Sequence, residues 1–65
     1  MQIKLNGERH DTVAHTIAEL LTEQQAPAQG VAVAVNEQVI SKRDHALTVL
    51  REGDSVELIR AVQGG

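Results

Sequence analysis

The last two residues, Gly64 and Gly65, are where the sequence most directly suggests chemistry. Glycine has no Cβ, so a Gly-Gly end can enter a narrow channel in an extended form that most residues could not follow. The α-carboxylate of Gly65 is ionised at neutral pH and unhindered, so it can attack an activated phosphate. Adenylation would then make it a good acyl donor to a second nucleophile. The sequence therefore suggests Gly65 as a carboxylate that can be activated for acyl transfer, with a frayed tail as the alternative.

The remaining polar residues do not form a recognisable catalytic or metal-binding pattern. His10 and His15 are five positions apart, which differs from the i, i+4 spacing that places two imidazoles on one helical face. His45 falls in a polar segment, and we expect all three histidines to be surface or turn residues. Glu52 and Asp54 suit a turn better than acid–base catalysis. The sequence predicts no enzyme in its own right and no bound metal.

Composition limits the class of protein further. The chain has 65 residues, no cysteine, no aromatic residue and a net charge of −3. It is one small domain without disulfides or Cys-ligated metal, and it has neither stacking platforms nor net positive charge for nucleic acid. No apolar run approaches the roughly 18 residues of a membrane span, and no signal-peptide pattern is present. We expect a cytoplasmic protein, monomeric when free, without nucleic-acid or membrane partners.

The first third of the chain predicts a hairpin. The segment Met1–Leu5 alternates apolar and polar residues as a half-buried strand does. The dipeptide Asn6-Gly7 tolerates the positive φ angles of a tight turn, so a weak second strand should cover Glu8–Thr12.

A short helix should follow this hairpin. Thr16 and Glu19 have the spacing of a capping box, and Pro27 with Gly30 should end the helix near Gln25. The helix would place Glu19 and Glu23 on its polar face. Its apolar stripe comprises Ile17, Leu20 and Leu21, and either Val13 or Ala14 should pack just before the cap.

The second half predicts three further strands. Val31–Val35 alternates large and small residues, which indicates an internal strand with something lying close to its alanine side. A short strand is expected at Gln38–Ser41, a loop at Lys42–Ala46 and a final strand at Ser55–Val62. The residues expected to return to the core between them are Leu47, Val49 and Leu50. This order of elements indicates an α+β domain with one helix across a mixed sheet, in which the first and last strands are parallel.

A domain of this order ending in Gly-Gly resembles the ubiquitin-like β-grasp family, and within it the thiamine-biosynthesis sulfur carriers. The resemblance spans essentially the whole chain and implies a mixed sheet of four to five strands with one main helix packed across one face. It implies a carrier domain over 1–62 and a flexible tail over 63–65. His45 stands where many relatives have a loop aromatic. The stretches that carry the resemblance are Met1–Ile3 with Asn6-Gly7, Thr16–Leu21, Val33–Asn36, Leu50–Leu58 and Val62–Gly65.

The resemblance also implies a mechanism and its partners. An adenylyltransferase would use Mg-ATP to adenylate the Gly65 carboxylate, so the carrier itself would bind no cofactor. Sulfur from a cysteine desulfurase or a comparable donor would replace AMP and leave a thiocarboxylate. Thiazole synthase would then accept the sulfur.

The last strand and tail are the expected docking region. If Val56 and Leu58 face inward, alternation turns Ile59 outward. The partner-binding residues expected are Ile59, Arg60, Ala61, Val62 and Gln63, followed by Gly64. Ile59 could instead only cover a neighbouring strand. Other functions left open are a sulfur carrier for molybdopterin or cysteine synthesis, a protein modifier that forms isopeptides, and an interaction module.

Overall fold

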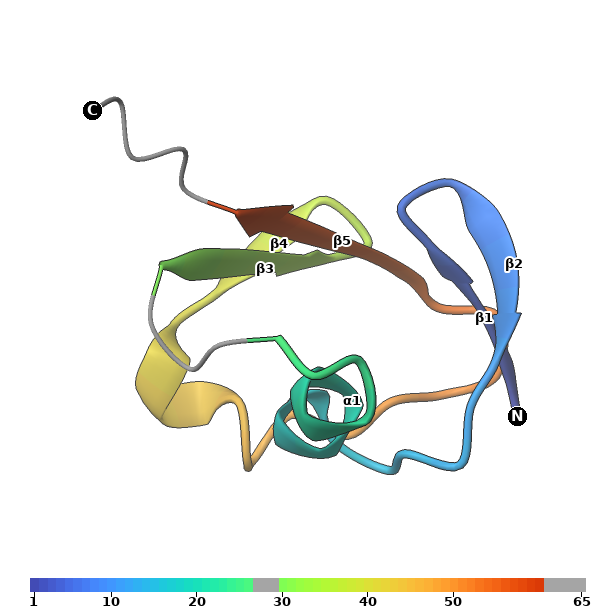
Figure 1. Cartoon of the computed structure of the whole chain (residues 1–65), viewed down its shortest axis with the longest axis horizontal. Helices are drawn as coiled ribbons and strands as arrows, with labels where there is room; N and C mark the ends of the chain where they lie inside the picture. The colour runs from blue at the N-terminus through green and yellow to red at the C-terminus, as the bar shows by residue number, and fades with distance from the viewer. Residues whose placement is uncertain (27–29, 61–65) are drawn as a thin grey trace.

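A mixed sheet of five strands packs against one α-helix in the computed structural model, which describes residues 1–26 and 30–60 (Figure 1). The strand order is β2-β1-β5-β3-β4; β1 and β5 are parallel, and the other neighbouring pairs are antiparallel. The predicted α+β fold, including its parallel first and last strands, is confirmed. The elements are β1 (Gln2–Leu5), β2 (Glu8–Asp11), α1 (Ile17–Glu23), β3 (Val31–Val35), β4 (Gln38–Ile40), the 3₁₀ helix η1 (Lys42–Asp44) and β5 (Ser55–Arg60).

Strand β5 is held at the centre of the sheet by both hairpin turns. Asn6 and Asn36 open these turns with φ of 52° and 51°, in the left-handed region that asparagine tolerates. Each asparagine also uses its side chain. The Leu58 amide donates to Asn6 Oδ1 at 2.8 Å, and the Ser55 amide donates to Asn36 Oδ1 at 3.0 Å. The strand that leads into the C-terminal residues is therefore fixed along both of its sides.

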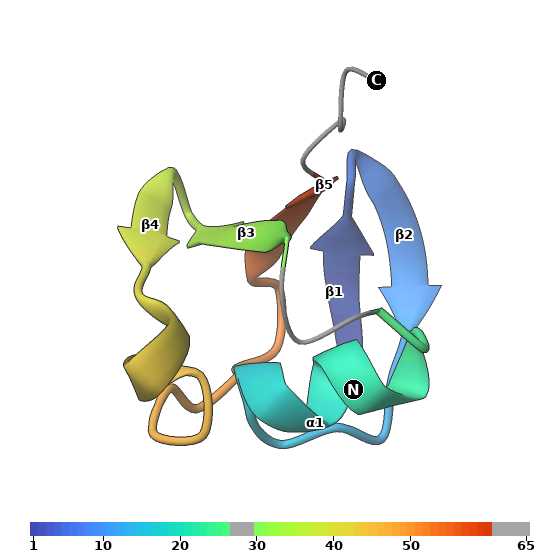
Figure 2. The same cartoon turned by 60° about the vertical axis from the view of Figure 1, so that its left-hand side comes forward.

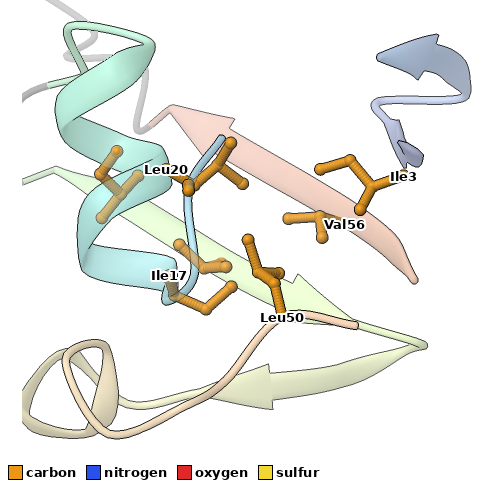
Figure 3. Close-up of a cluster of buried hydrophobic side chains, with 8 residues drawn as sticks. Ile3, Ile17, Leu20, Leu50 and Val56 are labelled. Atoms are coloured by element: carbon orange, nitrogen blue, oxygen red, sulfur yellow. The ribbon is translucent and has the colours of Figure 1, made fainter. Parts of the chain in front are cut away.

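The core lies between the sheet and α1, where the predicted helical stripe meets residues from three strands (Figure 3). Ala14 is buried, whereas Val13 is 86% exposed, so Ala14 is the residue that packs before the helix cap. The core residues are Ile3, Ala14, Ile17, Leu20, Leu21, Val33, Leu50 and Val56.

The first turn of α1 is capped by its own residues and by a distant segment. The Glu19 amide donates to Thr16 Oγ1 at 3.2 Å, as the capping box predicts. The Glu19 carboxylate accepts from the His15 amide at 2.7 Å, one position before the cap. The Ile17 and Ala18 amides donate to the carbonyl oxygens of Thr48 and His45. Because a helix start leaves its first amides without partners in the helix, the segment after β4 is needed to complete α1.

This segment after β4 differs from the prediction. Residues 42–44 form the helix η1 instead of a loop. Leu47 and Val49 are 76% and 60% exposed, and only Leu50 enters the core as predicted. His45 was expected at the surface but is buried, because its carbonyl oxygen caps α1 and its Nε2 lies 3.3 Å from the Ile40 carbonyl oxygen.

The end of α1 differs slightly from its predicted position. The helix ends at Glu23 with Gln24 as its C-cap, rather than near Gln25. The described part of β5 ends at Arg60, and the residues predicted to continue this strand lie outside the described residues.

The side chain of Glu23 ties the end of α1 to the segment after β2, although the helical pattern placed it on the polar face. The carboxylate accepts from Thr12 Oγ1 at 2.7 Å and from the Val13 amide at 3.3 Å, and His10 Nε2 lies 2.9 Å away. The hydrogen bonds from His10 and then Thr12 lower the pKa of Glu23 from 4.5 to about 2. The ionised form of Glu23 thus stabilises the folded chain.

We expect Glu23→Gln to reduce the free energy of unfolding at pH 7 by about 1–2 kcal/mol, a range limited by the partial exposure of the carboxylate. Because the folded-state pKa is depressed, the wild-type contribution is fully present above pH 4.5 and is lost as the pH falls towards about 2. Urea unfolding at several pH values should therefore show a shallower acid dependence in the variant. Glu8→Gln, at an exposed position, is the control and should change the stability by less than about 0.5 kcal/mol. Equal acid dependence in wild type and Glu23→Gln would contradict this role.

Candidate functional site

Strand β5 carries the chain from the centre of the sheet to the residues of interest. It lies between β1 and β3, and α1 covers only one face of the sheet (Figure 2). The tail residues predicted to act, which are Ala61, Val62, Gln63, Gly64 and Gly65, lie outside the described residues. Five residues in fully extended form span at most about 17 Å, which sets the upper limit on the distance between Gly65 and the end of β5.

Ile59 faces away from the helix, as alternation along β5 predicts. Val56 is fully buried and Leu58 packs against the core, whereas Ile59 is 53% exposed. Arg60 is exposed too, but alternation places it on the helix side of the sheet. The structure therefore places two of the predicted contact residues, Ile59 and Arg60, on opposite faces of the sheet.

Residues from two neighbouring strands extend the apolar surface around Ile59. Ala32 lies opposite Ile59 in the β3–β5 register, and Ala34 lies opposite Val39 in the β3–β4 register. Ala32 is exposed, Ala34 is half-buried and Val39 is 74% exposed. We call Ala32, Ala34, Val39 and Ile59 the outer apolar patch. Of these four residues, the sequence predicted only Ile59 as a contact residue. The alternation of valine and alanine had indicated that something lies close to the alanine side of β3, but it did not identify Ala32, Ala34 or Val39 as part of a surface patch.

The side chains of His10 and His45 make contacts within the described part of the chain. His10 pairs with Glu23, and His45 lines a hollow of about 300 Å³ between α1 and η1 whose other walls are mostly apolar. Within residues 1–26 and 30–60, no three His, Asp or Glu side chains are placed to hold a metal ion. No helix in these ranges is long and apolar enough to cross a bilayer.

Comparison with known proteins agrees with this architecture. The model of the ThiS family matches residues 3–65. The chain belongs to the ThiS family. It is 38% identical to the sulfur carrier protein ThiS of Thermus thermophilus, over 94% of this chain and 95% of that protein. A crystal structure of the thiamine biosynthesis protein ThiS from Geobacter metallireducens superposes with a TM-score of 0.86 at 28% identity, covering both chains fully.

A second kind of relative is much longer than this chain. The thiazole synthase of Magnetococcus marinus is 38% identical over the whole of this chain, which spans only 20% of that protein. A ThiS-like region therefore occurs inside a protein named thiazole synthase.

These findings confirm the predicted β-grasp fold and the predicted membership of the thiamine-biosynthesis sulfur carriers. The matched ThiS relative is named as a carrier and not as a catalyst. The division into 1–62 and 63–65 and the roles of the individual site residues stay predictions.

Proposed function

We propose that this ThiS-family chain delivers sulfur for thiazole formation as a thiocarboxylate on Gly65. An oxygen of the Gly65 carboxylate attacks the α-phosphorus of ATP, and pyrophosphate leaves. A sulfide equivalent then attacks the carbonyl carbon of the acyl-adenylate, and AMP leaves. The thiocarboxylate sulfur is finally passed to the thiazole precursor on thiazole synthase.

The observation that carries this proposal is the family match, which runs through the Gly-Gly end to residue 65. The absence of cysteine supports it further, because the chain has no thiol that could hold sulfur as a persulfide. The position of β5 supports the proposal as well, because the C-terminal residues follow a strand that is held on both sides in the sheet.

Three partners follow from this chemistry. An adenylyltransferase binds ATP and Mg²⁺, so those groups belong to the partner and not to this chain. A cysteine desulfurase or comparable donor supplies sulfur as a persulfide, and a thiol of the donor system reduces it to the sulfide level and is itself oxidised to a disulfide. Thiazole synthase receives it, and the ThiS-like regions within proteins of that name support this pairing. We place this cycle in the cytoplasm, with the free carrier as a monomer.

Intact-mass measurement tests the proposal. The chain is incubated with ATP, the adenylyltransferase of the same organism and a sulfur donor. A carrier gains the mass of one oxygen-to-sulfur exchange at its C-terminal residue. A protein modifier would instead appear attached to other proteins, and an interaction module would remain unchanged; either result would refute the proposal.

The outer apolar patch should contribute to partner binding. We expect Ile59→Asp to leave the fold intact, because the side chain is exposed, and to raise the KM for the carrier in adenylation roughly tenfold through loss of an apolar anchor. Steady-state adenylation kinetics measure this, with circular dichroism as the check on folding. Leu47→Asp is the matched control at an exposed apolar position in the loop after η1. Unchanged kinetics for Ile59→Asp would show that Ile59 only covers its neighbouring strand.

A further inference from the structure

Two cations lie side by side on the outer face of the sheet. Lys4 of β1 is directly opposite Arg9 of β2. Ile3 is buried against the helix side, so alternation turns Lys4, and Arg9 with it, to the outer face. Both residues are exposed, and both line a shallow hollow of about 180 Å³.

Within the described residues this pair has no carboxylate partner. The ion pairs there join Asp11 to the N-terminal amine and His10 to Glu23. Two carboxylates near the cations already have backbone partners. Asp11 Oδ1 lies 3.3 Å from the Met1 amine, and Glu52 Oε2 accepts from the Gln2 amide at 3.1 Å. Like charges directly opposite each other destabilise a strand pair, and no ion pair within the described residues offsets the repulsion between Lys4 and Arg9.

The pair lies on the same face as the outer apolar patch. Lys4 is opposite Ser55 of β5, and Ser55 and Ile59 share the outward side of that strand. Four residues along a strand span about 13 Å. An interface of standard size, about 800 Å² per partner, is roughly 30 Å across. A single interface of this size that includes Ile59 can therefore also cover Lys4 and Arg9.

The surroundings of the pair favour a compact anion. Glu57 faces outward from β5, and Asp11 and Glu52 lie near the cations. These carboxylates, with the overall charge of −3, repel an extended polyanion. One carboxylate placed between two cations avoids that repulsion and gains two charge-assisted hydrogen bonds.

We propose that Lys4 and Arg9 together bind an aspartate or glutamate side chain of thiazole synthase and so orient the carrier on that enzyme. This inference rests on the proposed function, because it takes thiazole synthase as the partner. The apolar patch supplies contact area, and the cation pair supplies orientation and a faster encounter.

Binding to purified thiazole synthase of the same organism tests the proposal. We expect the double variant Lys4→Glu with Arg9→Glu to bind roughly tenfold more weakly at low salt, with the difference shrinking as salt is added. The double variant Lys42→Glu with Arg43→Glu makes the same charge change in η1 and should bind as wild type does. The neutral pair Lys4→Gln with Arg9→Gln should also bind more weakly, with a melting temperature equal to or above that of wild type.

Three outcomes would overturn the proposal. Equal binding by the wild type and the Lys4/Arg9 variants would remove the cation pair from the interface. An equal loss of affinity in the Lys42/Arg43 control would show that overall charge, and not the Lys4/Arg9 pair, determines binding. Weaker adenylation with unchanged binding to thiazole synthase would assign the pair to the adenylyltransferase. Failure of the wild-type chain to gain sulfur would instead refute the proposed function, and it is measured separately by intact mass.

Discussion

Removal of Gly65 is expected to abolish thiocarboxylate formation while changing the free energy of unfolding by less than about 0.5 kcal/mol. The shortened chain still ends in a glycine carboxylate, but that carboxylate is withdrawn by about 3.5 Å. Misplacement of a reacting group by about 1 Å can already lower a rate a hundredfold. Stability should change little, because glycine has no side chain to bury, and the described core residues all lie between Ile3 and Val56.

Intact mass after the complete sulfur-loading reaction measures the first effect, and urea unfolding measures the second. A chain extended by one glycine is the matched second variant, since it keeps the Gly-Gly sequence and shifts the carboxylate outward by the same distance. Both variants should fail to gain sulfur. Thiazole formation supported by the Gly65-deleted chain would refute the carrier mechanism.

Local sequence patterns predicted the hairpins and the sheet well. The valine–alanine alternation marks β3 with its observed bounds, Val31–Val35. The two-residue turn Asn6-Gly7 places the strands that flank it. These features depend on neighbours within a few residues, where backbone preference and side-chain period act directly.

The segment after β4 could not be predicted in the same way. Its polar residues around His45 indicate a solvated loop, yet the carbonyl oxygens of His45 and Thr48 complete the start of α1. Leu47 and Val49 are apolar but exposed, since only Leu50 points into the core. Burial here depends on contacts with residues about 30 positions earlier in the chain, which no local pattern encodes.

Some residues of the outer face could be predicted from the sequence, and others could not. Alternation along the last strand was sufficient to turn Ile59 outward. The positions of Ala32 and Val39 on the same face depend on the pairing of β3 with β5 and with β4, which had to be observed. The tight Asn6-Gly7 turn already sets Lys4 opposite Arg9, so the register of the predicted hairpin contained the signal for that pair.

We expect Leu20→Ala in α1 to lower the free energy of unfolding by about 3 kcal/mol. Leu20 is fully buried in the core between α1 and the sheet, so its removal loses apolar burial and leaves a cavity. At about 0.05–0.15 kcal/mol per residue, a chain of this length has a total stability of only roughly 3–10 kcal/mol. This one truncation should therefore remove a large fraction of the free energy of unfolding.

Urea denaturation followed by circular dichroism measures this effect, and Leu47→Ala is the matched control because it makes the same truncation at a 76% exposed position. That control should change the stability by less than about 0.5 kcal/mol. Leu20→Ala should also lower the yield of thiocarboxylate at 37 °C in proportion to the unfolded fraction, since the Gly65 carboxylate itself is untouched. If both variants lost about 3 kcal/mol, Leu47 would have to be buried, which would contradict the exposed position of this residue in the segment after β4. A stable Leu20→Ala chain would mean that α1 does not depend on the sheet.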